Sequence, residues 1–142
     1  MAIVVDSGAI YALYDADDSH HAHVRSAVDR ERGPLIVPSA LLAEADYLVC
    51  AFLGIDAELH FIDDIRSGFF TLVHLTDIDL TRCRAIVERY RDSKLGLADA
   101  SVIATAERMG IERILTVDER HFRMVRTSQG TPFILLPADV IK

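Results

Sequence analysis

Short runs of consecutive apolar residues alternate with longer amphipathic stretches along the whole chain. The apolar runs are rich in β-branched residues and predict buried strands; they cover residues 2–5, 35–37, 69–75, 113–116 and 133–135. The amphipathic stretches repeat apolar side chains every three or four residues and predict helices; they cover residues 8–14, 20–32, 38–53, 55–67, 80–90, 97–109 and 118–124. Either Thr76 or Asp79 is the expected N-cap of the helix 80–90.

This alternation predicts the fold class. Strands that are apolar at every position are buried on both faces, as in parallel sheets covered by helices. We therefore expect an α/β fold, a three-layer α/β/α domain with a central parallel sheet and right-handed crossovers, formed by residues 1–142 as a single domain. In such sheets a ligand binds beyond the carboxyl ends of the strands, where the strand order reverses.

Composition agrees with a soluble domain that buries a sizeable core. Of the 142 residues, 51% are apolar and 26% charged, which excludes disordered and fibrous proteins. No apolar run approaches the roughly 20 residues needed to cross a bilayer, and the first residues lack the cationic start of a signal peptide. We expect no membrane association, a mature chain that starts at Met1, and a place in the cytoplasm. Cys50 and Cys83 form no Cys-x-x-Cys pair and are interpreted as packed free thiols.

Charge is divided unevenly between the two halves of the chain. Residues 1–79 hold 4 Lys+Arg against 14 Asp+Glu, whereas residues 80–142 hold 11 against 8, which together give the net charge of −7. The overall acidity argues against a protein that coats DNA without regard to sequence, but it permits a nucleic-acid enzyme with a local basic surface. Residues 82–94 offer such a surface, with Arg82, Arg84, Arg89, Arg91 and Lys94.

Four carboxylates occupy positions that suit a site at the carboxyl edge of the sheet. Asp6 and Asp118 each come directly after a predicted strand. Asp99 falls on the apolar stripe of the helix 97–109, where an isolated acid needs a partner, although helix capping would also explain it. Glu44 lies at the edge of the apolar face of its own helix. Each position alone is also explained by a turn, a cap or a solvated face.

The four acids together point to a metal ion. No cluster of basic residues neighbours Asp6, Glu44 or Asp99 in the sequence. Two like charges about 5 Å apart repel by roughly 3 kcal/mol at an effective dielectric constant near 20, so a convergent set needs a cation or bound protons. Carboxylate oxygens suit Mg²⁺ or Mn²⁺, and Mg²⁺ in such sites also takes water and phosphate oxygens. This chemistry favours phosphoryl transfer.

The order and spacing of these residues resemble a known family. The segments that carry the resemblance are Val4-Val5-Asp6-Ser7-Gly8-Ala9, Asp18-Ser19-His20-His21, Glu44 in a helix begun by Pro38-Ser39, Leu97-Ala98-Asp99-Ala100, and Leu115-Thr116-Val117-Asp118 with Phe122. Together they are similar to PIN-domain ribonucleases, above all to the VapC-type toxins of type II toxin–antitoxin systems. The resemblance extends over essentially the whole chain.

The resemblance implies a fold, an activity and partners. Asp6, Glu44, Asp99 and Asp118 would be the catalytic residues and hold Mg²⁺ or Mn²⁺, with the hydroxyls of Ser7 and Thr116 in support. The activity would be endoribonuclease cleavage of a transfer RNA or a ribosomal RNA loop, which inhibits translation. The family further implies a homodimer and a small cognate VapB-like antitoxin whose tail enters the acidic groove.

Basic residues near two of the acids are candidates for binding the RNA backbone. Arg89, Arg91 and Lys94 lead toward Asp99 in the sequence, and Arg120 follows Asp118. Phosphate contacts of this kind supply affinity without reading sequence. His121 is interpreted as a turn residue.

Two other functions stay open from the residues alone. Asp77-Ile78-Asp79-Leu80-Thr81 matches the Asp-x-Asp-x-Thr pattern of haloacid-dehalogenase phosphatases, although helix capping also explains these acids and the lysine that such enzymes need has no clear counterpart. A non-catalytic PIN-like binding module is the other alternative, which the presence of all four acids disfavours.

Overall fold

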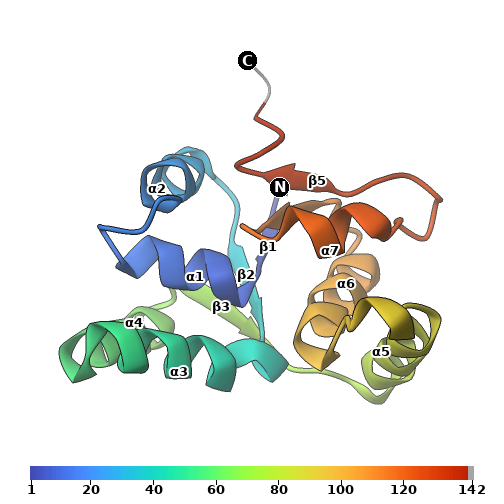
Figure 1. The fold of residues 1–142 in the computed structure, drawn as a ribbon, viewed down its shortest axis with the longest axis horizontal. Helices are drawn as coiled ribbons and strands as arrows, with labels where there is room; N and C mark the ends of the chain where they lie inside the picture. The colour runs from blue at the N-terminus through green and yellow to red at the C-terminus, as the bar shows by residue number, and fades with distance from the viewer. Residues whose placement is uncertain (141–142) are drawn as a thin grey trace.

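A five-stranded parallel sheet forms the centre of the fold (Figure 1). The computed structural model describes residues 1–140. The strands are β1 (Ile3–Val5), β2 (Leu35–Pro38), β3 (Phe70–Val73), β4 (Arg113–Leu115) and β5 (Ile134–Leu136), in the order β3-β2-β1-β4-β5. Every pairing between neighbouring strands is parallel. The predicted parallel sheet is confirmed.

Helices connect the strands and complete the three-layer α/β/α architecture expected from the sequence. They are α1 (Ser7–Tyr14), α2 (His21–Arg30), α3 (Leu42–Leu53), α4 (Ile55–Ser67), α5 (Asp77–Arg89), α6 (Leu97–Met109) and α7 (Glu119–Met124). Two short 3₁₀ turns, η1 (Ser39–Leu41) and η2 (Arg91–Ser93), precede α3 and α6. Helix α6 contacts β1, β2 and β4, and α5 packs on α6.

The element boundaries differ from the predicted ones in a few places. Helix α2 ends at Arg30, two residues early, because Glu31 turns away: its Oε1 accepts from the Gly33 N–H at 2.9 Å, and its carboxylate pairs with Arg113 of β4. The predicted strand 69–75 shortens to β3, and the last strand begins at Ile134 instead of residue 133. None of these shifts moves a candidate site residue.

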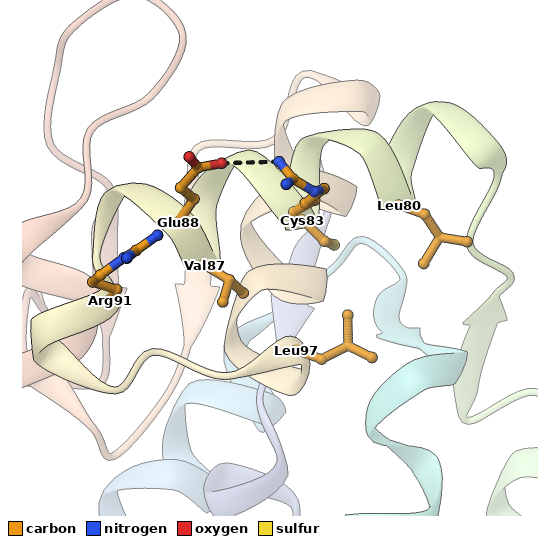
Figure 2. A pocket seen from close by; sticks show the side chains of 7 residues that line it. Leu80, Cys83, Val87, Glu88, Arg91 and Leu97 are labelled. Carbon is orange, nitrogen blue, oxygen red and sulfur yellow. Dashed lines mark hydrogen bonds and ion pairs between the residues drawn. The ribbon is translucent and has the colours of Figure 1, made fainter.

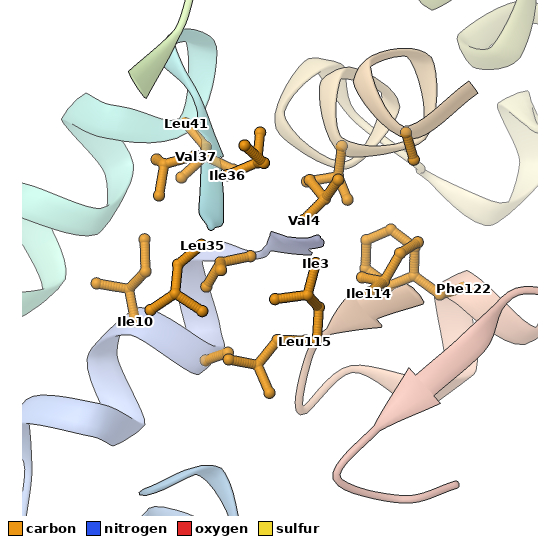
Figure 3. Close-up of a cluster of buried hydrophobic side chains, with 14 of the residues drawn as sticks. Ile3, Val4, Ile10, Leu35, Ile36, Val37, Leu41, Ile114, Leu115 and Phe122 are labelled. Carbon is orange, nitrogen blue, oxygen red and sulfur yellow. The ribbon is translucent and has the colours of Figure 1, made fainter. Parts of the chain in front are cut away.

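The core surrounds the central strand β1. Ile3, Val4 and Val5 are all buried, as a strand covered on both faces requires. Figure 3 shows Ile10 of α1 and the helix α6 on opposite sides of this strand. Both cysteines are free thiols, as predicted, with Cys83 buried and Cys50 half-buried. Within residues 1–140, every helix is too short or too polar to span a bilayer.

The Asp-x-Asp-x-Thr motif is a helix start. Thr76 is the N-cap of α5, its Oγ1 accepts from the Asp79 N–H at 3.2 Å, and the Asp79 carboxylate accepts from the Thr76 N–H at 2.9 Å. Arg108 Nε also donates to this carboxylate at 2.8 Å. These contacts form a capping box with a buried ion pair, so the Asp79 carboxylate stabilises the start of α5 and is not available as a nucleophile.

The chain topology fixes where a site can form. β1 pairs with β2 on one side and with β4 on the other, so the strand order reverses there. The helices that follow β1 and β4 begin at the carboxyl edge of the sheet. A crevice at this switch point is the expected ligand position in such folds.

Candidate active site

Four carboxylates from four separate segments meet at this switch point. Asp6 directly follows β1, Asp118 is the N-cap of α7, and Glu44 and Asp99 lie in the first turns of α3 and α6. Burial and the charges of Asp99 and Glu44 raise the pKa of Asp6. Burial and the charges of Asp118 and Glu44 likewise raise the pKa of Asp99. Asp99 therefore lies within electrostatic reach of the other three acids singled out from the sequence.

Asp6 is the most deeply buried of the four. Its Oδ2 accepts a hydrogen bond from the Thr116 hydroxyl at 3.1 Å. Its Oδ1 is buried and has no hydrogen-bond partner within residues 1–140. Burial, and then the charge of Asp99, raise its pKa to about 7. A buried carboxylate oxygen without a hydrogen-bond partner is stabilised by a bound cation or a proton, so this atom is suited to bind a cation.

Two hydroxyls tie the carboxylates to the ends of the central strands. Thr116 Oγ1 donates to Asp6 and accepts from the Asp118 N–H at 2.9 Å, which links the ends of β1 and β4. Ser7 Oγ donates to Glu44 Oε2 at 3.1 Å, which holds the first turn of α3 against the first turn of α1. The two hydroxyls expected to support the acids thus each donate to one of them.

His121 is a site residue that the interpretation as a turn residue missed. Its Nδ1 lies 2.6 Å from Asp118 Oδ2, and its Nε2 lies 3.1 Å from the Ser93 carbonyl oxygen. The Ser93 carbonyl and an ionised Asp118 both accept hydrogen bonds, so with Asp118 charged both ring nitrogens donate and the ring is then an imidazolium. The hydrogen bond to Asp118 raises the His121 pKa accordingly. The spacing Asp-x-x-His across a helix N-cap was the signal in the sequence.

The cluster fits a divalent cation. Oxygen atoms of Asp99 and Asp118 and a ring nitrogen of His121 lie within 4.8 Å of one another. The two carboxylates can share a cation, whereas the His121 imidazolium, which has no free lone pair, stays a hydrogen-bond donor to Asp118. The orphaned Asp6 Oδ1 adds an oxygen donor beside Asp99. Carboxylate oxygens are the donors that hard divalent cations prefer. The arrangement could therefore bind a metal ion.

The candidate RNA-binding residues lie at the end of α5, around η2 and at the start of α7, in segments next to those that carry Asp99 and Asp118. Arg89 ends α5 with its guanidinium 5.7 Å from the centre of the Tyr90 ring, Arg91 begins η2, and Lys94 follows η2 with a positive φ of 55°. Arg120 lies in the first turn of α7. All four are exposed, and none forms an ion pair within the described part of the chain. By contrast, Arg82 and Arg84 pair with acids, Glu107 and Glu88.

Comparison with known proteins agrees with this geometry. The PIN domain family matches residues 3–127. Ribonuclease VapC26 of Mycobacterium tuberculosis is 33% identical over 135 residues, which cover 95% of this chain and all of that protein.

Solved structures share the fold at lower identity. The structure of VapC20 of Mycobacterium tuberculosis, a sarcin-ricin loop cleaving toxin, aligns with a TM-score of 0.77 and 19% identity over 83% of this chain and 91% of its own. FitAcB from Neisseria gonorrhoeae aligns with a TM-score of 0.63 and 14% identity, over 84% of this chain and 88% of its own. VapBC2 from Rickettsia felis, bound to a DNA fragment of its promoter, aligns with a TM-score of 0.65 and 12% identity, over 88% of this chain and 93% of its own.

The raised pKa of Asp6 predicts how stability depends on pH. The folded protein binds this proton more tightly than the unfolded chain, whose Asp pKa is about 3.9. The free energy of unfolding in EDTA should therefore fall as the pH rises from about 4 through about 7, the Asp6 pKa, by at most about 1.4 kcal/mol per pH unit from this group. The raised His121 pKa acts in the same direction.

Asp6→Asn removes the Asp6 contribution. Relative to the unmutated protein, this variant should gain stability steadily from pH 5 to pH 8 in urea unfolding with EDTA. Asp17→Asn, on the exposed loop after α1, is the control and should run parallel to the unmutated protein. If the pH dependence of the free energy of unfolding of Asp6→Asn also ran parallel to that of the unmutated protein, ionisation of Asp6 would not destabilise the folded state, which would contradict the prediction.

Proposed function

The chain belongs to the PIN-domain family and is a VapC-type toxin ribonuclease, and from this membership we propose that Asp6, Glu44, Asp99 and Asp118 hold Mg²⁺ or Mn²⁺ for RNA hydrolysis. The observation that carries the proposal is the orphaned, buried Oδ1 of Asp6 among three further carboxylates. We further propose that residues 1–142 form one nuclease domain and that the protein acts in the cytoplasm.

The residues around the cation have separable roles. When bound, the cation supplies the Lewis-acid chemistry for attack of water on phosphorus. The four carboxylates set the geometry, and Thr116 and Ser7 orient Asp6 and Glu44 through the hydrogen bonds described above. His121 holds Asp118 in place. Because the RNA 2′-hydroxyl is not the nucleophile in this scheme, we expect products with a 5′-phosphate.

The alternative functions have less support. A binding module without catalysis would not need a buried, unpartnered carboxylate next to Asp99, since that arrangement costs stability. The phosphatase alternative needs an available Asp79, whose carboxylate is held by Arg108 and Thr76.

We also propose two protein partners. The first is a small antitoxin with a tail that carries Arg or Lys into the acidic cluster, as the family resemblance implies; the presence of VapBC2 and FitAcB among the structural relatives supports it. Co-purification with the product of a neighbouring short open reading frame tests this partner. The second partner is another copy of the chain.

An exposed apolar surface on α5 and the start of α6 suits this homodimer. A hollow of about 450 Å³ lies there, lined by Leu80, Cys83, Arg84, Val87, Glu88, Arg91 and Leu97 (Figure 2). Leu80, Val87 and Leu97 are exposed, as an interaction surface requires. The same surface carries Arg84 and Glu88, so two copies related by a two-fold axis can present opposite charges to each other.

A charged substitution on this surface should separate the homodimer. Val87→Glu places a carboxylate in an apolar contact, and we expect a monomer in sedimentation velocity at concentrations where the unmutated chain is a dimer. Ile62→Glu, at an exposed apolar position of α4, is the matched control and should stay dimeric. Unchanged sedimentation of Val87→Glu would exclude this surface.

Asp99→Asn tests the metal assignment. The variant should lose RNA cleavage in Mn²⁺ about 100-fold or more, because one ligand charge is gone. In EDTA its melting temperature should equal or exceed that of the unmutated protein, because like-charge repulsion is relieved. Mn²⁺ should raise the melting temperature of the unmutated protein and raise that of the variant much less. A destabilised variant that still cleaves RNA would contradict the assignment.

Replacement of Arg89 and Arg91 by Ala tests the RNA-binding surface. The slope of log affinity against log salt is negative, and each lost phosphate contact should make it less steep by about 0.7 for single-stranded RNA, so the double variant should be less steep by about 1.4. Binding is measured in EDTA by fluorescence anisotropy on RNAs of different sequence. Arg25 and Arg30 of α2, replaced together, provide the control. An unchanged slope would make Arg89 and Arg91 solvated surface residues.

A further inference from the structure

A second pocket adjoins the acidic cluster without including any of its carboxylates. Its volume is about 300 Å³, near the lower end of the size range of sites for small ligands. It is lined by Gly8, Tyr11, Asp18, His20, Leu48, Phe52 and Val117. The proposed chemistry uses none of these side chains.

Three of the lining residues belong to the segments that carry the active site. Gly8 directly follows Ser7, and Val117 lies between Thr116 and Asp118. Leu48 lies one helical turn beyond Glu44 on α3. A Cβ atom on Gly8 would lie 3.0 Å from Val117 Cγ2, so this wall is closely packed. A ligand in the pocket would therefore be a direct neighbour of a phosphate at the carboxylates.

The walls are aromatic and apolar. The rings of Tyr11 and Phe52 meet edge to face with their centres 5.9 Å apart. Phe52 is 68% exposed, so its ring is available for contact. Leu48 and Val117 complete a surface of the kind on which proteins stack unpaired bases.

The rim offers a hydrogen-bond acceptor. Asp18 Oδ2 accepts from the His20 N–H at 2.9 Å, whereas Oδ1 makes no hydrogen bond within the described residues. A carboxylate accepts from the exocyclic amine of a base, as in cytosine recognition. The Tyr11 hydroxyl donates to Asp15, which adds a second carboxylate beside the pocket and disfavours a phosphate there.

We propose that this pocket binds the nucleobase of a nucleotide beside the scissile phosphate, with the base against Tyr11 and Phe52 and its exocyclic amine on Asp18. The inference rests on the ribonuclease function proposed above. Cytosine, adenine and guanine carry such an amine, whereas the only donor on the pairing edge of uracil, N3–H, lies between two carbonyl oxygens that the carboxylate repels. The pocket is thus a specificity site for a base that carries an amine over uracil.

Binding can be tested apart from cleavage. Metal-free protein is titrated with cytidine and with uridine while NMR follows the Gly8 amide and the methyl groups of Leu48 and Val117. Cytidine should shift these signals at about tenfold lower concentration than uridine. Asp18→Asn should abolish that difference, because the amide also donates to uracil, and Asp17→Asn should keep it. Equal binding of the two nucleosides, or shifts confined to other residues, would overturn the inference.

Cleavage supplies the second measurement. A random RNA pool is cut in Mn²⁺ and the product 5′ ends are sequenced. We expect about tenfold depletion of uracil at one position next to the cut, lost in Asp18→Asn. Phe52→Leu should raise KM about tenfold with little change in kcat, because a stacking surface is lost, whereas Phe69→Leu, at an exposed aromatic position elsewhere, should not.

The outcomes separate this inference from the proposed function. Metal-dependent cleavage with no base preference would leave the ribonuclease intact and overturn the pocket assignment. No cleavage, with selective cytidine binding, would overturn the ribonuclease proposal and keep the pocket as a base site. If Phe52→Leu weakens only the complex with an antitoxin and leaves base preference unchanged, the pocket belongs to the protein partner and the inference fails.

Discussion

Repulsion between the buried carboxylate of Asp6 and its neighbours Asp99 and Glu44 is the constraint on which the site depends. Asp6 follows the central strand of the sheet, and its side chain is almost fully shielded from solvent. Its charge is opposed by burial and by Asp99, so the folded protein tolerates it only with a proton or a cation. The fold thus stores an unfavourable interaction at the place where the proposed catalytic cation would bind.

Neutral hydroxyls and one imidazolium limit this repulsion. Thr116 and Ser7 each donate one hydrogen bond to a carboxylate, and His121 brings a full positive charge to Asp118. The Thr116 contact joins the ends of β1 and β4, and the Ser7 contact joins α1 to α3. The second hydrogen bond of His121, to the Ser93 carbonyl, joins α7 to η2. The hydrogen bonds that reduce the repulsion between the carboxylates therefore also hold the segments of the site next to one another.

The sequence predicted those parts of the site that follow from periodicity and strand ends. Asp6 and Asp118 could be placed because apolar strands end beside them, and Asp99 because it interrupts an apolar helix stripe. Glu44 gave a weaker signal, since it lies at the exposed edge of the apolar face of its helix, and the family resemblance strengthened its selection. The contact of His121 with the Ser93 carbonyl joins residues 28 positions apart, which no local pattern encodes. The phosphatase interpretation of the Asp77-x-Asp79 motif is not supported for the opposite reason. The local pattern is present, but Asp79 caps the start of α5 and pairs with Arg108.

The acidic and basic halves of the chain contribute different residues to the candidate site. The acidic half supplies Asp6, Glu44 and the acidic rim of the base pocket, whereas the basic half supplies Arg89, Arg91, Lys94 and Arg120. A polyanion is attracted by the second set and repelled by the first unless a cation is present. His121 hydrogen-bonds both Asp118 and the Ser93 carbonyl of η2, which lies between Arg89 and Lys94, so it links the segment that carries these basic residues to a carboxylate. The cation and the RNA should therefore favour each other's binding, since each reduces the electrostatic cost of the other.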